Sequence, residues 1–209
     1  MTDLVLAHSP HGGAYTWQPV AEILRSRGHR VDLPDYPPQP AAPFWRQHLD
    51  AIVRLVRGDR TVVVAHSGAG PLLAHVHGLR RFRAVYVDAG FRKDARAPAG
   101  MSVVARGRGF VPAWANEDDL AELLPDLESR RRLIASMDPL PREHFAEGVP
   151  YLDPPDDGAY LLLSPPYVEP AAVARARGWP VRELGGENHY LMLADPATVA
   201  DEVLALIIP

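Results

Sequence analysis

The segment that most constrains the fold is residues 61–65 (TVVVA), an apolar run with β-branched side chains on both faces. Such a run predicts a central parallel strand that is covered by helices on both sides. Apolar runs at 4–7 and 84–87 predict two more buried strands, and helical periodicity fills the intervals between the three runs. The resulting β-α-β-α-β order predicts an α/β sheet with functional groups at the carboxyl ends of its strands.

The same patterns continue along the chain. We expect helices at 17–27, 44–57, 71–79, 170–177 and 196–208, and further strands at 30–33, 160–163 and 181–184. Residues 91–157 break this rhythm with scattered prolines and aromatic residues and one polar helix, expected around 117–137. We therefore predict a single domain over residues 1–209, with a core at 1–90 and 158–209 and an insertion at about 91–157 that lies over the sheet.

Composition excludes several classes of function. The absence of cysteine excludes disulfides, thiolate metal sites and a cysteine nucleophile. A net charge of −4 gives no basic field that would gather nucleic acid or an anionic membrane, so we expect neither partner. Because no residues have metal-ligand or nucleotide-loop spacing, we also expect no metal and no cofactor. No signal peptide or membrane-spanning run is visible, which predicts a soluble, cytoplasmic protein.

The sequence AHSGAG at 65–70 follows the best strand and precedes a helix. It matches the pattern small-x-Ser-x-small, in which a sharp turn lifts the serine hydroxyl above the sheet. In that interpretation Ser67 is a nucleophile and the Gly68 N–H lies beside it at the helix N-terminus. The alternative is a serine that merely caps a helix.

A serine nucleophile needs a base, and His189 is the best placed of the nine histidines. It lies in a glycine-rich loop between the last strand and the last helix, which brings it to the sheet edge where Ser67 is expected. The alternative for a loop histidine is a surface position, and we expect His75 and His77 to have packing or surface roles.

These motifs resemble the α/β-hydrolase superfamily, in the small-molecule branch of plant methyl-ester esterases and hydroxynitrile lyases. The resemblance covers roughly 3–90 and 158–209 and depends on HSPHGG at 8–13 with Trp17, GHRV at 28–31, and His189 followed by Met192 and Asp195-Pro196. It implies an α/β-hydrolase fold, a small helical cap in the inserted stretch, and a small-molecule ester or thioester as substrate. The branch includes dimers, which makes a homodimer possible.

Two positions depart from that branch. The residue that usually supplies an oxyanion N–H is Pro10 here, and proline has no N–H. Either the Ser9 hydroxyl substitutes for it, or the reaction builds no full oxyanion. The acid that orients the histidine normally follows the strand at 160–163, where this chain has no aspartate. Asp88, at the end of the preceding core strand, and Glu169 are the two candidates, and we favour Asp88.

The aromatic residues Trp45, Phe110, Trp114, Phe145 and Tyr151 either line a pocket under the insertion or belong to the core. Together the motifs predict a serine-dependent hydrolase with Ser67 as nucleophile and His189 as base. Two alternatives stay open, a non-hydrolytic enzyme of the same fold (lyase, elimination or cyclisation) and a ligand-binding accessory protein.

Overall fold

The computed structural model describes residues 1–37, 41–91 and 101–207. Its central sheet has six strands, all parallel, in the order β2-β1-β3-β4-β7-β8. The strands are β1 (Asp3–Ala7), β2 (Arg30–Asp32), β3 (Thr61–His66), β4 (Arg83–Val87), β7 (Gly158–Leu162) and β8 (Val181–Glu183). Every residue of β3 is buried, as expected of a central strand.

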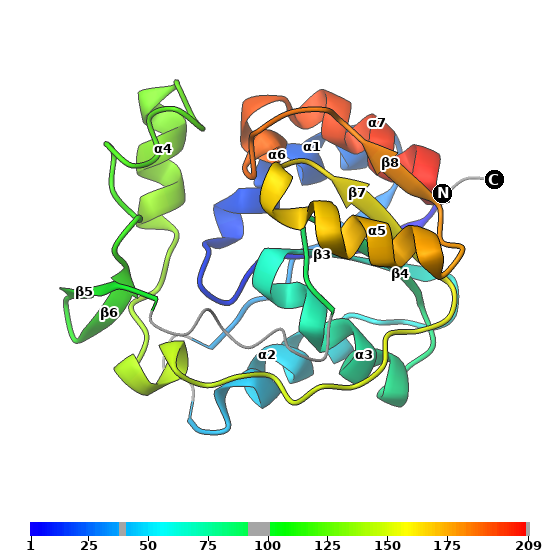
Figure 1. Ribbon diagram of the computed structural model, residues 1–209, viewed down its shortest axis with the longest axis horizontal. Helices are drawn as coiled ribbons and strands as arrows, with labels where there is room; N and C mark the ends of the chain where they lie inside the picture. The colour runs from blue at the N-terminus through cyan, green and yellow to red at the C-terminus, as the bar shows by residue number, and fades with distance from the viewer. Residues whose placement is uncertain (38–40, 92–100, 208–209) are drawn as a thin grey trace.

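Helices cover both faces of the sheet (Figure 1). They are α1 (Gln18–Ser26), α2 (Phe44–Val53), α3 (Gly70–Leu79), α5 (Val168–Ala176), α6 (Leu191–Ala194) and α7 (Pro196–Ile207), and the inserted stretch adds α4 (Leu127–Ala135). One core cluster joins the sheet to α1, α6 and α7, and the other joins it to α2, α3 and α5. This three-layer arrangement of helices around a parallel sheet confirms the predicted fold class.

The inserted stretch differs from the prediction. It contains a two-stranded hairpin, β5 (Val103–Arg106) with β6 (Gly109–Pro112), as well as α4 and a 3-10 turn, η3 (Arg142–Phe145). The helix expected around 117–137 is confined to α4, because Asp126 caps its first turn by accepting the Ser129 N–H at 2.7 Å. Figure 1 shows α4 and the hairpin together, off one end of the sheet.

Another helix ends early. The helix expected at 44–57 ends at Val53, because residues 54–56 tighten into turns in which Leu55 and Val56 donate to backbone carbonyls three residues back. The part of the insertion at 92–100 lies outside the described residues. Within the ranges that are described, no helix has the length and apolar character needed to span a membrane.

Candidate active site

Ser67 directly follows β3 and is the first residue of the 3-10 turn η2 (Ser67–Ala69), with a φ of 56°. A positive φ is strained for a residue with a side chain, and such strain recurs at functional sites. The glycine that begins the helix after this turn is required by contacts. A Cβ on Gly70 would lie 2.7 Å from Ala89 Cβ and from the Gly90 carbonyl oxygen. The chain therefore forms the strand-to-helix turn that the small-x-Ser-x-small pattern predicts.

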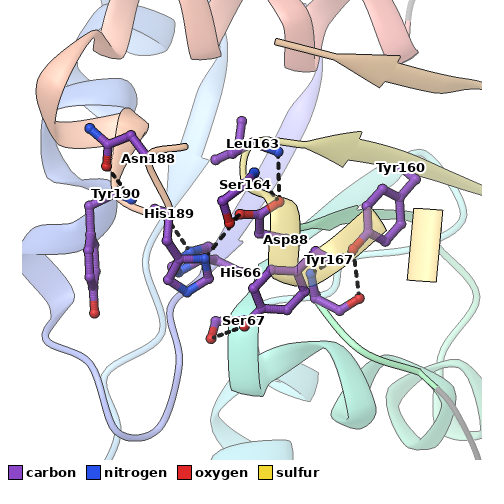
Figure 2. A network of polar contacts seen from close by, with 11 residues as sticks. His66, Ser67, Asp88, Tyr160, Leu163, Ser164, Tyr167, Asn188, His189 and Tyr190 are labelled. Carbon is purple, nitrogen blue, oxygen red and sulfur yellow. Dashed lines mark hydrogen bonds and ion pairs between the residues drawn. The ribbon is translucent and has the colours of Figure 1, made fainter. Parts of the chain in front are cut away.

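His189 lies in the loop between β8 and α6, and its Nδ1 is 3.1 Å from Asp88 Oδ2. Asp88 directly follows β4, is 0% exposed and also has a positive φ, of 42°. Its carboxylate accepts the backbone N–H groups of Leu163 at 2.7 Å and Ser164 at 3.2 Å, and the Ser164 hydroxyl at 2.5 Å. These four contacts hold the carboxylate in one orientation against the imidazole (Figure 2).

Glu169, the other candidate acid, lies in the first turn of α5 with an exposed side chain. Of the two carboxylates that the sequence left open, the structure brings Asp88 to His189. The Asp88 position is rigid because it ends a buried strand, whereas Glu169 stands on the outer surface of a helix.

His66 lies beneath the His189 loop, and sequence reasoning assigned it no role. Its Nε2 donates to the backbone oxygen of His189 at 3.1 Å, and the two ring centroids are 4.3 Å apart. Burial lowers the pKa of His66 well below its usual value, and the nearby His189 lowers it further. His66 is therefore neutral near pH 7 and supports the backbone of His189 rather than competing with it as a base.

Tyr167 is the second residue that sequence reasoning missed. It belongs to the 3-10 turn η4 (Pro165–Tyr167), and its hydroxyl lies 3.3 Å from Ser67 Oγ (Figure 2). Its ring is parallel to that of His189, with an interplanar angle of 1° and centroids 5.0 Å apart. Burial raises the pKa of Tyr167, so the phenol keeps its proton at neutral pH. A sequence signal did exist, since Tyr167 follows two prolines directly after a core strand.

The predicted oxyanion residues Ser9, Pro10 and Gly68 lie together on one wall of a cavity. Ser9 Oγ accepts the His11 N–H at 3.3 Å, and a Cβ on Gly68 would lie 2.8 Å from the same oxygen. Because a lone pair of Ser9 is already used by His11, the Ser9 proton is available to another acceptor. The Ser9 hydroxyl is thus the side-chain donor next to Pro10, which has no N–H.

The cavity has a volume of about 500 Å³, a size typical of small-molecule sites. Ser67, His189 and Tyr167 line one part of it, which we call the reactive wall, and the inserted stretch contributes many of the other lining residues. The residues that the insertion contributes are Met101, Trp114, Asp119, Leu120, Leu123, His144, Glu147 and Val149. The cavity therefore places Ser67 and His189 where a mostly apolar small molecule could reach both.

Of the five aromatic residues considered for the pocket, Trp45 and Trp114 line it. Phe145 stacks on His11 with ring centroids 5.1 Å apart, and Phe110 lies in β6 under the Arg142 guanidinium. Tyr151 is exposed on the surface.

Asn188 connects the histidine loop to the inserted stretch. Its side-chain nitrogen donates to the Leu123 carbonyl at 2.7 Å, and its side-chain oxygen accepts the Tyr190 N–H at 2.9 Å. The two residues that flank His189 in the chain are thereby fixed to each other and to the wall formed by the insertion.

A cluster of imidazoles forms another part of the cavity wall. His48 on α2 and His144 on η3 share a 2.8 Å hydrogen bond between their Nε2 atoms, and His11 packs edge-on against His144. One ring of the bonded pair donates and the other accepts. Because burial lowers the pKa of His48 to about 4 and that of His144 to about 3, both rings are neutral at pH 7 and are of opposite tautomer. Among the described residues, no group of three or more His, Cys, Asp or Glu side chains has the geometry to hold a metal ion.

The comparisons with known proteins agree with this architecture. Residues 4–202 match the family described as the alpha/beta hydrolase family. No curated protein sequence matches the chain.

Similar solved structures include an extracellular alpha/beta-hydrolase from a Paenibacillus species, at 19% identity and a TM-score of 0.70 over 99% of each chain. Tomato methylketone synthase I, solved with 2-tridecanone, is 15% identical with a TM-score of 0.70, covering 98% of this chain and 96% of that one. Polyneuridine aldehyde esterase is 16% identical with a TM-score of 0.64, covering 98% and 99%. At these identities the likeness establishes the fold, which is the one that the sequence motifs implied.

Proposed function

Because this chain belongs to the alpha/beta hydrolase family, we propose that it hydrolyses a small-molecule ester or thioester through an acyl-serine intermediate. The observation that carries the proposal is the strained Ser67 turn, which opens into the same cavity as a histidine bonded to a buried aspartate. A nucleophile, a base and an orienting carboxylate are the groups that acyl transfer requires.

In this proposal His189 takes the Ser67 proton as Oγ attacks the acyl carbon, and the carbonyl electron pair moves onto oxygen. Asp88 keeps the imidazole in the tautomer that leaves Nε2 free to act as the base. The Gly68 N–H and the Ser9 hydroxyl stabilise the oxyanion. His189 then gives the proton to the leaving group, and water releases the acyl group by the same steps.

The mostly apolar cavity supports a neutral substrate of small-molecule size. Polyneuridine aldehyde esterase is an esterase by name, and its structural similarity is consistent with ester chemistry for this chain. A second candidate is non-hydrolytic chemistry on the same fold. It is favoured by Pro10, which removes one backbone oxyanion donor, and it uses Ser67 and His189 for proton transfer without an acyl intermediate.

Labelling with a fluorophosphonate probe, measured by intact mass, tests the proposal. We expect one adduct per wild-type chain, no adduct on Ser67→Ala, and a large loss of labelling rate on His189→Ala. A panel of esters and thioesters of increasing acyl size then defines the substrate. A folded wild-type protein that resists labelling and cleaves no member of the panel would overturn hydrolysis in favour of the second candidate.

A further inference from the structure

The hydrogen bond between Ser67 and Tyr167 conflicts with simple activation of the serine. Ser67 Oγ lies 3.3 Å from the Tyr167 hydroxyl, and the hydrogen bonds of the described residues include none between Ser67 and His189. A serine needs its proton directed at the base before it can attack. In the resting arrangement Ser67 Oγ is instead bonded to a phenol, with either hydroxyl able to donate, and this phenol is not a base at neutral pH.

Tyr167 is held firmly in this place. Pro165 and Pro166 precede it, its N–H donates to the Ser164 carbonyl at 3.1 Å, and Ser164 is itself bonded to Asp88. On the other side the Tyr167 ring lies flat against the His189 ring. The residues that orient the histidine thus also hold Tyr167 against Ser67. The contact does not depend on the free rotation of an exposed side chain.

We propose that Tyr167 is a positioning residue that holds the Ser67 hydroxyl away from His189 until substrate fills the cavity. The inference rests on the proposed function, because it concerns when Ser67 becomes a nucleophile. In the attacking step the Oγ to acyl-carbon bond forms, the carbonyl pair moves to oxygen and the Ser67 proton passes to His189. Tyr167 keeps its own proton throughout.

The substrate class follows from the same geometry. In this proposal an acyl group bound above Ser67 separates Oγ from the Tyr167 phenol. The Ser67 hydroxyl then loses its contact with Tyr167 and turns to His189. A small molecule that leaves this space empty does not displace the contact between Ser67 and Tyr167, so its binding does not activate the serine. We therefore expect substrates that occupy the space next to the reactive wall to be cleaved faster than small acetyl esters. The difference in rate should exceed the difference in binding affinity.

The test compares the rate constants of fluorophosphonate labelling of wild type and Tyr167→Phe, which keeps the ring and its stacking on His189. Loss of one hydrogen bond between neutral groups changes such an equilibrium by roughly two- to ten-fold, so we expect labelling to be faster by that factor. Tyr86→Phe is the matched control. Tyr86 is a buried tyrosine on β4, and its hydroxyl has no hydrogen-bond partner in the described part of the chain. We expect its labelling rate to equal that of wild type.

The pH dependence of labelling separates positioning from structural damage. In a plot of the labelling rate constant against pH, the rise that reports deprotonation of the base should occur at the same pH in wild type and Tyr167→Phe. The rate constant at the plateau should be higher in the variant. A crystal structure of the variant should place Ser67 Oγ in hydrogen-bonding distance of His189 Nε2.

Most of the other outcomes contradict the inference. Equal or slower labelling of Tyr167→Phe, or a rise at a different pH, shows that the phenol does not hold Ser67 back, while the proposed function stands as long as wild type is labelled. If neither protein is labelled, the proposed function fails and the inference fails with it. Labelling of Tyr167→Phe alone would be the strongest support.

Discussion

Asp88 and Ser164 share a 2.5 Å hydrogen bond across two neighbouring parallel strands, with the Ser164 hydroxyl donating to Asp88 Oδ2. Asp88 follows β4, and Ser164 follows β7, the strand after which the branch that this sequence resembles normally carries its acid. The carboxylate thus lies at the end of one strand, and its hydrogen-bond donor lies at the end of the neighbouring strand. The carboxylate nevertheless reaches His189.

Ser164→Ala should destabilise the protein, because the buried Asp88 carboxylate loses one of its four contacts. Hydrogen bonds to charged groups contribute about 1.5–3 kcal/mol, and we expect the free energy of unfolding from urea titration to fall by that amount. Ser26→Ala is the control, since Ser26 is exposed and its hydroxyl bonds only the Ile23 carbonyl within α1. Similar losses in the two variants would contradict the special role of Ser164.

Asp88→Asn should keep the fold and remove most of the activity, because an amide cannot stabilise the His189 imidazolium and favours the wrong tautomer. A drop in kcat of about 10³–10⁴ is typical of such a change. Glu169→Gln should stay within a few-fold of wild type, since Glu169 lies exposed on α5. Steady-state kinetics on one ester decides the assignment, and the reverse pattern would transfer the orienting role to Glu169.

Ser9→Ala should lower kcat by about 10²–10³ with little change in KM, because the oxyanion forms only in the transition state. Ser9→Thr keeps a hydroxyl at this position and should restore part of the rate. An unchanged kcat in Ser9→Ala would mean that the reaction does not need this donor, which favours the non-hydrolytic candidate.

Mild acid should destabilise the fold. Burial lowers the pKa of His11 and His48 to about 4 and that of His144 to about 3, whereas the unfolded chain has values near 6.5. Between these limits the unfolded state binds more protons, so the stability present above pH 6.5 is lost as the pH falls toward 4. Each histidine contributes a slope of up to about 1.4 kcal/mol per pH unit.

Urea titrations at pH 7, 6 and 5 measure this slope. His144→Gln should flatten it, while His77→Gln, which changes a half-buried histidine outside the cluster, should not. A free energy of unfolding that is constant from pH 7 to 5 would contradict neutral burial of the cluster.

The fold and the placement of Ser67 and His189 at one edge of the sheet were predictable because both depend on strand order. A parallel sheet brings all carboxyl strand ends to one edge, so a serine after β3 and a histidine after β8 share that edge whatever the intervening loops do. The sequence also reduced the acid to two positions. Choosing between them requires side-chain distances that sequence does not contain.

The remaining features depend on how loops close in space. Tyr167 reaches Ser67 from 100 positions away in the chain, and His48 meets His144 through the insertion. No periodicity encodes such contacts. The β5–β6 hairpin was missed for a different reason, since four-residue strands of mixed polarity do not stand out from loop sequence.

The Asn188 contacts have one more consequence. One amide side chain joins Leu123, on the insertion side of the cavity, to the loop that carries His189, so a displacement of Leu123 that keeps this hydrogen bond also shifts the loop. Widening the cavity by displacing that wall also displaces the base. An attempt to evolve this protein toward bulkier substrates therefore meets a trade-off between cavity volume and rate. Lining positions outside the insertion and the His189 loop, such as Trp45 on α2, offer a way to enlarge the cavity without displacing the base.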